Sequence, residues 1–182
     1  RDDEILVRVV ATGVCHTDVV VRDGLLPTPH PVVLGHEGAG VVERVGRNVR
    51  KVAAGDAVVM TFDSCGGCPA CAAHAQSYCH AFFPRNFFAT RPDGTGTISK
   101  DGEIIHGNFF GQSSFATHAL CRESNVVKVP SDAPLELLGP LACGVQTGAG
   151  AVMNALRVSA GASFAVFGAG SVGLSAVMAA RA

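Results

Sequence analysis

The chain has 182 residues, enough for one large domain or two small ones; 48% of them are hydrophobic and 16% are charged. This balance is typical of an ordinary globular protein with a buried core. The formal net charge of −1 gives no reason to expect binding to nucleic acid or to an anionic membrane surface. Residues 1–4 are charged and are not followed by the hydrophobic region of a signal peptide, so we expect no signal peptide and a cytoplasmic location.

Short strands separated by tight turns are expected over the first part of the chain. A short helix is expected at 16–23 and should end at Gly24, because glycine commonly follows a helix C-terminus. The dipeptide Asp101-Gly102 is typical of a hairpin turn. The expected strands are 4–10, 38–45, 57–61, 97–100, 103–106, 115–120 and 126–129. Many short strands with short turns indicate a small barrel or sandwich.

The sequence changes character after Pro140. A helix is expected at 147–156, an apolar strand at 163–167, and a second helix from 174 to 182. A glycine turn joins the last two elements, and its glycines are Gly168, Gly170 and Gly173. Strand, glycine turn and helix in this order predict the start of a doubly wound α/β domain that binds a dinucleotide.

The apolar stretch 164–180 has about the length of a short membrane span. Its glycines favour a buried strand, turn and helix instead, so we expect no membrane contact. An acidic residue about 20 residues after the turn would bind the ribose of the dinucleotide, and the chain ends before that position. NAD and NADP therefore stay open, and we expect the chain to be a fragment of a longer protein.

Four of the seven cysteines fall in one run, Cys65-x2-Cys68-x2-Cys71-x7-Cys79. Four thiolates at this spacing can surround one ion in a tetrahedron, an arrangement that suits zinc. An iron–sulfur cluster also takes four thiolates, but the proline that follows the last cysteine in ferredoxin-type runs is replaced here by His80. A disulfide-rich loop would need an oxidising compartment. We therefore expect a closed, structural zinc site.

Three further metal-binding side chains lie far apart in the sequence. Cys15 follows a predicted strand, His36 precedes another, and Cys143 lies at the border between the two regions. Two cysteines and one histidine are a known ligand set for a catalytic zinc whose fourth position stays open. Spacing alone cannot join them, and each residue taken singly could be an ordinary buried side chain.

With these motifs the chain resembles the zinc-dependent medium-chain alcohol dehydrogenases over essentially its whole length. The segment Gly35–Gly46 matches that family's zinc signature, and the cysteine run and the glycine turn follow in the family's order. Segments 11–18, 111–117 and 136–141 make the chain most similar to the bacterial aryl-alcohol (benzyl-alcohol) dehydrogenases.

The fold implied by this resemblance is mixed α/β. A GroES-like, β-rich catalytic domain would occupy residues 1–144 and include the structural-zinc lobe at about 62–83. The beginning of an NAD(P)-binding Rossmann domain, which is doubly wound, would occupy residues 145–182 and be truncated there.

The resemblance also implies roles for single residues. The ligands of the catalytic zinc would be Cys15, His36 and Cys143, and those of the structural zinc Cys65, Cys68, Cys71 and Cys79. The catalytic residues would be Thr17, which takes the proton from the alcohol, Asp18, which orients a ligand, and Glu37 beside the zinc. The cofactor would contact His16, Thr147, Gly168, Gly170 and Gly173. Thr17 could also cap the helix that follows and Asp18 could favour its first turn, and these structural roles are compatible with the catalytic ones.

The implied activity is the reversible oxidation of a primary alcohol, of the aryl or benzyl class, to the aldehyde. Hydride would pass to NAD, with NADP still open, and each chain would hold two zinc ions, one acting as a Lewis acid. Many relatives pass the proton on to a histidine at the position of Val20, whereas aryl-alcohol members carry an aliphatic residue there. The partners would be a small-molecule alcohol or aldehyde and further copies of the chain, in a homodimer or homotetramer.

Two alternatives stay open. The glutathione-linked formaldehyde dehydrogenase branch shares the same scaffold, and a truncated chain could be a zinc-binding module without catalysis. We expect the fragment alone to be inactive. Phe62 and Phe115 are candidates to line an aromatic substrate pocket, with plain core as the alternative, and Cys121 is expected to be a packing residue.

Overall fold

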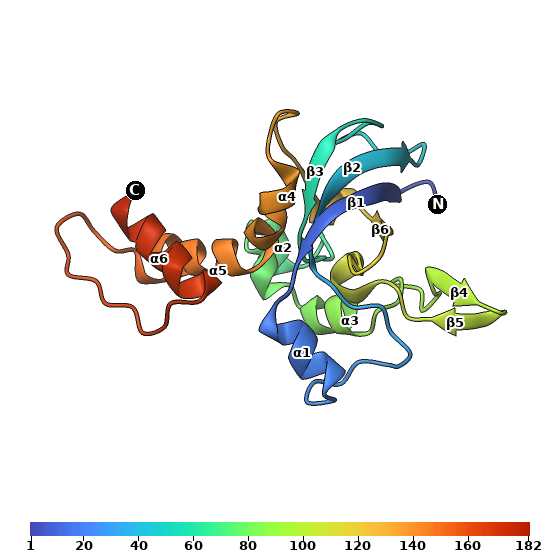
Figure 1. The fold of residues 1–182 in the computed structure, drawn as a ribbon, viewed down its shortest axis with the longest axis horizontal. Coiled ribbons are helices and arrows are strands. Elements are labelled where there is room, and N and C mark those ends of the chain that lie inside the picture. The colour runs from blue at the N-terminus through green and yellow to red at the C-terminus, as the bar shows by residue number, and fades with distance from the viewer.

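The computed structural model describes residues 1–182, and its largest element is a five-stranded antiparallel sheet of order β6-β1-β2-β3-β7. Its strands are β1 (Ile5–Gly13), β2 (Glu37–Val45), β3 (Ala57–Met60), β6 (His118–Cys121) and β7 (Val126–Lys128). A separate hairpin projects from the body of the molecule (Figure 1). It consists of β4 (Ile98–Lys100) and β5 (Glu103–Ile105).

Alternating apolar side chains turn one face of the sheet into the main core. In β1, Ile5 and Val7 are buried whereas Arg8 is exposed, as the period of two in a strand requires. Val58 of β3 packs into the same cluster. The expected strands of the first part are confirmed with small shifts of their ends, although the one at 115–120 begins only with β6.

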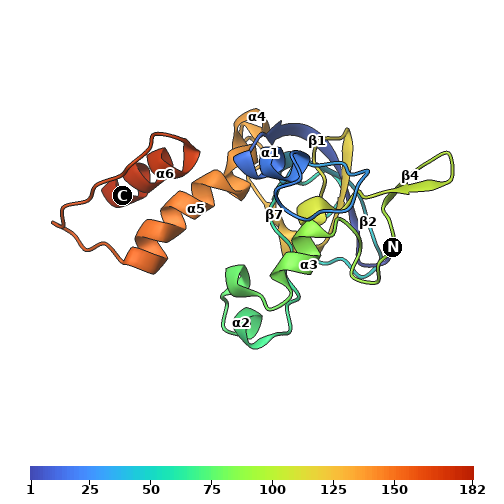
Figure 2. The same ribbon diagram turned by 90° about the horizontal axis from the view of Figure 1, so that it is seen from below.

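Short helices and 3-10 turns lie in the connections between the strands and after β7. The predicted helix α1 (His16–Arg22) is confirmed, and Gly24 follows it with a φ of 73°, in the left-handed region that glycine adopts readily. The other short helices and 3-10 turns are α2 (Pro69–Ala72), η1 (Gln76–Tyr78), α3 (Phe82–Phe87), η2 (Phe109–Gly111), η3 (Glu123–Asn125), α4 (Leu135–Leu138) and η4 (Gly139–Ala142). The cysteine lobe around α2 stands out from the body in Figure 2. No helix here has both the length and the apolar character needed to cross a bilayer.

The carboxyl-terminal helices extend away from the sheet and lie side by side (Figures 1 and 2). α5 (Gly144–Gly150) continues into the π-helical turn η5 (Ala151–Leu156), and α6 (Ser171–Arg181) packs against α5. Both helices predicted in this region are confirmed.

The strand predicted at 163–167 is wrong. These residues form no strand, and Phe167 is fully exposed. A parallel strand needs a neighbouring strand to satisfy its backbone hydrogen bonds, and residues 145–182 contain no other strand that could supply them. Of the predicted dinucleotide-binding unit, the structure therefore shows the turn and the helix but not the strand.

Candidate active site and metal centres

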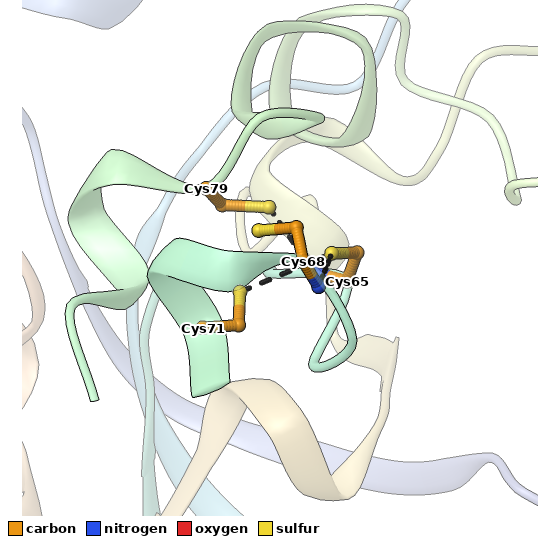
Figure 3. A group of neighbouring side chains, drawn as sticks. All are labelled: Cys65, Cys68, Cys71 and Cys79. Carbon is orange, nitrogen blue, oxygen red and sulfur yellow. Dashed lines mark hydrogen bonds between the residues drawn. The ribbon is translucent and has the colours of Figure 1, made fainter. Parts of the chain in front are cut away.

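The four-cysteine run folds into a compact cluster of sulfur atoms (Figure 3). The Sγ atoms of Cys65, Cys68, Cys71 and Cys79 all lie within 4.8 Å of one another, and none of these residues forms a disulfide. Cys65 N–H donates to Cys79 Sγ at 3.3 Å, and Cys68 N–H donates to Cys65 Sγ at 3.3 Å. Backbone donors favour the thiolate, and those of His80 and Cys71 lower the pKa of Cys68 to about 6. Four thiolates in this arrangement could hold one zinc ion with no position left open.

The cysteine lobe is tied to the sheet through Asp63, a buried carboxylate just before the first cysteine of the run. Arg85 Nη1 donates to Asp63 Oδ2 at 2.5 Å, and Ser124 Oγ donates to Asp63 Oδ1 at 2.7 Å. The Asp63 backbone N–H donates to Asn86 Oδ1 at 2.8 Å. These contacts join the end of β3 to α3 and to η3, so they fix where the lobe stands.

The second set of ligands comes from three separate elements. Cys15 caps the amino end of α1, His36 directly precedes β2, and Cys143 precedes α5. Their ligand atoms and a carboxylate oxygen of Glu37 lie within 4.8 Å of one another, and Cys15 Sγ is 3.9 Å from Cys143 Sγ. The structure therefore brings together residues whose sequence spacing could not connect them.

The chemistry of this set fits a metal ion. His36 is 1% exposed, and its Nε2 is buried with no hydrogen-bond partner in the protein. Buried polar atoms in folded proteins nearly always have a partner, so an orphaned ring nitrogen beside two sulfurs calls for an explanation. A zinc ion bound by two thiolates and this imidazole would give Nε2 a partner and would leave a fourth position for a substrate.

Asp18 holds two of these ligands in place. Its Oδ1 lies 3.1 Å from His36 Nδ1 and accepts the Gly35 N–H at 3.0 Å, while its Oδ2 accepts the Cys15 N–H at 3.1 Å. The carboxylate thereby directs Nε2 of the imidazole toward the sulfurs. Gly35 has a φ of 92°, and a Cβ there would stand 2.4 Å from the Phe115 nitrogen, so glycine is required at this close approach.

The set concentrates negative charge, which a proton or a metal ion can neutralise. The hydrogen bond with Cys143 lowers the pKa of Cys15 to about 3 and raises the pKa of the Cys143 thiol. Burial opposes charge on His36, but Asp18 and Cys15 outweigh it and raise the pKa of His36 to about 9. Burial, and then the negative charge of Cys15, raise the pKa of Glu37 above its ordinary value.

The three residues predicted to be catalytic all lie at this set. Thr17 Oγ1 is 3.6 Å from Cys15 Sγ, and Glu37 Oε1 accepts the Gly144 N–H at 3.4 Å. Asp18 has the contacts given above. His16, predicted to contact the cofactor, is exposed on the first turn of α1.

A cleft of about 880 Å³ opens beside His36 and is large enough for a small organic molecule. Residues of the second ligand set, of the cysteine lobe and of α5 line it together. Its walls include Phe62, Tyr78, Phe82, Phe110, Cys143 and Thr147. Phe62 thus lines a pocket as expected, and the exposed Thr147 faces the same space. Phe115 is not among the lining residues and packs against Gly35 instead.

The glycine turn has the close packing expected for a dinucleotide-binding turn. A Cβ on Gly173 would stand 2.0 Å from the Gly168 carbonyl oxygen, so only glycine allows this turn to close onto α6. Gly170 caps the amino end of α6, and a Cβ on Gly168 or Gly170 would meet nothing within 4 Å. The amino end of the helix is therefore accessible to a phosphate group.

Three residues at the cleft and the second ligand set could not be identified as site residues from the sequence. Phe82 and Phe110 reach the cleft, yet each belongs to a phenylalanine pair that an ordinary core would also use. Gln112 is buried beneath the second ligand set, where its amide bonds to the His36 carbonyl. Only the unusual burial of a glutamine marks it, and a sequence does not reveal burial of a polar residue.

Comparison with known proteins places the chain among alcohol dehydrogenases. Residues 1–131 match the family described as alcohol dehydrogenase GroES-like domain. The chain is 54% identical over 183 aligned positions to the geraniol dehydrogenase of Castellaniella defragrans, a match that covers 100% of this chain and 49% of that protein. The chain spans about half the length of the curated relatives it matches.

Two crystal structures are closely similar. An alcohol dehydrogenase zinc-binding domain protein from Burkholderia ambifaria has a TM-score of 0.96 and 62% identity, and the match covers 100% of this chain and 49% of that one. Benzyl alcohol dehydrogenase from Acinetobacter calcoaceticus has a TM-score of 0.92 and 53% identity, with 98% and 48% of the two chains covered. The chain with its two ligand clusters therefore belongs to the zinc-dependent, medium-chain alcohol dehydrogenase family and carries that family's GroES-like domain.

Proposed function

We propose that the protein is a zinc-dependent alcohol dehydrogenase that oxidises a primary alcohol to the aldehyde and passes the hydride to a nicotinamide cofactor. The observation that carries this proposal is the meeting of Cys15, His36 and Cys143, with Nε2 of His36 unpaired and with His36 and Cys143 lining a cleft that has aromatic walls. A zinc ion held there would supply Lewis-acid activation of the alcohol oxygen. The other four cysteines would hold a second, structural zinc.

The residues around Cys15, His36 and Cys143 would orient the ligands and move the proton. Asp18 orients His36 and Cys15, and the hydroxyl of Thr17, next to Cys15 Sγ, takes up the proton of the alcohol. Glu37 lies among the ligand atoms and would assist the exchange of the fourth ligand. Val20 follows Thr17 one turn later on α1 and cannot carry the proton further, so the proton leaves by a route outside this helix.

The aromatic walls of the cleft favour a primary alcohol with an unsaturated carbon next to the carbinol. Benzyl alcohol and geraniol, named as substrates of two relatives, both have that feature. A flat unsaturated group packs well on rings such as Phe62 and Phe110, whereas ethanol would leave most of the cleft unfilled. No lysine or arginine lines the cleft to pair with the carboxylates of a glutathione adduct, which disfavours the formaldehyde dehydrogenase branch.

For the cofactor we propose NAD, bound at the turn of Gly168, Gly170 and Gly173 with Thr147 and His16 beside it. The supporting observation is the tight turn before α6, which exposes the amino end of that helix. We place the domain boundary between residues 144 and 145, where α5 leaves the sheet (Figure 1). Seven unpaired cysteines, two of them in an open site, suit a reducing compartment such as the cytoplasm.

The test is turnover by the complete protein with benzyl alcohol, geraniol and ethanol, each with NAD and with NADP. We expect oxidation of the first two alcohols, loss of activity on metal removal, and recovery with added zinc. The Cys143→Ala variant is the matched control for the metal dependence. If no alcohol is oxidised in a zinc-dependent way, the proposal fails, and retained zinc without cofactor binding would identify a non-catalytic module. A preference for ethanol, or for formaldehyde with glutathione, would overturn only the substrate class.

A further inference from the structure

The segment Phe109–Ser114 runs directly behind His36 in an unusual backbone conformation. Phe110 has φ 50° and ψ 33°, and Ser113 has a φ of 53°, both in the left-handed region that residues other than glycine rarely adopt. Such conformations persist only where the surroundings enforce them, and they gather at functional sites. Here Asn125, 1% exposed, supplies one constraint, because its Nδ2 donates to the Gly111 carbonyl at 2.9 Å.

The strained conformation brings the Phe110 ring against the His36 imidazole. The ring centroids are 4.6 Å apart with an interplanar angle of 30°, which is a stacked pair. Phe109 meets the same imidazole edge-on, at 5.8 Å and 80°. Rotation of the imidazole out of this plane would break the stacking contact. The stack therefore fixes the plane of the ring.

Gln112 fixes the backbone on both sides of Glu37. Its Nε2 donates to the His36 carbonyl at 2.9 Å, and its Oε1 accepts the Gly38 N–H at 3.1 Å. The same Nε2 also donates to the Met60 carbonyl at 3.2 Å. An amide can make all of these contacts because it has two donors and an acceptor, whereas a carboxylate of the same shape has no donor.

We propose that Phe110 and Gln112 are positioning residues for the metal ligand His36: Phe110 sets the plane of the imidazole, and Gln112 sets the backbone that carries His36 and Glu37. This inference rests on the proposed function only in that Cys15, His36 and Cys143 bind a metal. The alternative is that both residues merely fill the core, as neighbouring buried side chains do.

The experiment replaces zinc with cadmium-113 in the complete protein and records its NMR spectrum, in which each metal site gives its own resonance. The test variants are Phe110→Leu and Gln112→Glu. For each variant, we expect a shifted or broadened resonance for the site with two cysteines and one histidine. We also expect that site to release its metal to a chelator at least about ten times faster than in the wild type. The resonance of the four-cysteine site is the internal control and should not move.

Matched controls separate positioning from packing. Phe87 is buried in the same aromatic cluster and contacts Phe109 and Phe110 but has no ring contact with His36, so Phe87→Leu should lower the melting temperature and move neither resonance. Asn86 is fully buried and donates to the Asp63 and Phe82 carbonyls, away from His36, so Asn86→Ala serves the same purpose for Gln112 at the histidine-containing site.

The inference is overturned if Phe110→Leu and Gln112→Glu lower the melting temperature but leave the resonance and the release rate of the histidine-containing site unchanged. It is equally overturned if Phe87→Leu and Asn86→Ala disturb that site as much as the test variants do. Should Gln112→Glu fail to fold, Gln112→Met removes the same hydrogen bonds without adding charge and is judged by the same readout. The cadmium spectrum needs no turnover, so failure of the alcohol assay leaves this test intact.

Discussion

The two cysteine-based clusters of this protein are built in opposite ways. The four ligands of the cysteine lobe come from one short stretch and are arranged largely by its own backbone N–H groups. Cys15, His36 and Cys143 come from three elements and are arranged by side chains such as Asp18. A set completed by four protein ligands can hold a lobe together, whereas a set of three leaves room for chemistry. Under the proposed function, the local ligands would serve folding and the assembled ligands would serve catalysis.

The two clusters also differ in the polar contacts that hold them in place. Polar contacts of Asp63 anchor the lobe as a whole, without reaching into the sulfur cluster. Around the open set, buried polar side chains act on individual ligands: Asp18 on His36 and Cys15, and Gln112 on the backbone of His36. A change near the open set should therefore affect activity before stability, and a change in the lobe should do the reverse.

The largest expected effect is that of Cys143→Ala, which removes a ligand from the open set. We expect kcat/KM for benzyl alcohol to fall by about 10³-fold or more, because a preorganised electrostatic group is lost. The melting temperature should change little, since Cys143 is half-buried and lies outside the main core. Steady-state kinetics measures the loss of kcat/KM, and thermal unfolding measures the change in melting temperature. A variant that keeps most of its activity would contradict the difference in role between the two clusters.

The corresponding change in the lobe is Cys79→Ala. We expect one zinc ion per chain to be lost and the free energy of unfolding to fall by several kcal/mol, on the order of 3–5 kcal/mol, because metal binding and folding of such a lobe are coupled. Cys121→Ala is the matched control, since Cys121 is buried in the main core and belongs to neither set. Metal analysis and denaturant titration decide the matter, and a variant as stable as the wild type would show that the lobe folds without its metal.

A smaller effect is expected from Asp18→Asn. The amide keeps the size of the carboxylate but places an NH2 group against a backbone N–H, at Cys15 or at Gly35. Metal affinity and kcat should fall by about 10–100-fold, as is usual when the partner of a ligating histidine is replaced. Asp23→Asn, at the exposed end of α1, is the control and should behave as the wild type. Equal losses in both variants would contradict a specific role of Asp18.

The smallest effect is expected at Glu4, whose side chain bonds to Arg1 and Arg91 and to neither cysteine cluster. Burial acts to raise the pKa of Glu4, but hydrogen bonds from Arg91 outweigh it and lower that pKa below its ordinary value. The pair therefore stabilises the fold fully above the unfolded-state pKa of about 4.3, and this stability is lost as pH falls through the lower folded-state pKa. Glu4→Gln should cost about 1–2 kcal/mol at pH 7 and retain both metals.

The measurement for Glu4 is the difference in unfolding free energy between wild type and variant from pH 7 down to about pH 3, a range that extends below the unfolded-state pKa of about 4.3. That difference should narrow toward the acidic end. A difference that stays constant over this range would show that the charge of Glu4 contributes nothing.

Features formed by residues close together in the sequence could be predicted from the sequence. The run from Cys65 to Cys79 has the spacing of a closed site, and its sulfurs do cluster. The open set could be joined only through family resemblance, because no spacing rule connects Cys15 with Cys143. The strand at 163–167 was predicted from its apolar residues, yet a strand also needs a hydrogen-bonding neighbour, which this part of the chain lacks. Phe110 and Gln112 gain their places through burial against His36, which depends on the assembled fold.

The most direct test of the contrast between a closed and an open site is a crystal structure of the complete protein with anomalous data at the zinc edge. Two peaks per chain are predicted. One should lie about 2.3 Å from the Sγ atoms of all four lobe cysteines, and the other within about 2.0–2.3 Å of Cys15 Sγ, His36 Nε2 and Cys143 Sγ, with its fourth position taken by no cysteine or histidine. A single peak, or a second peak enclosed by four cysteine or histidine ligands, would contradict it.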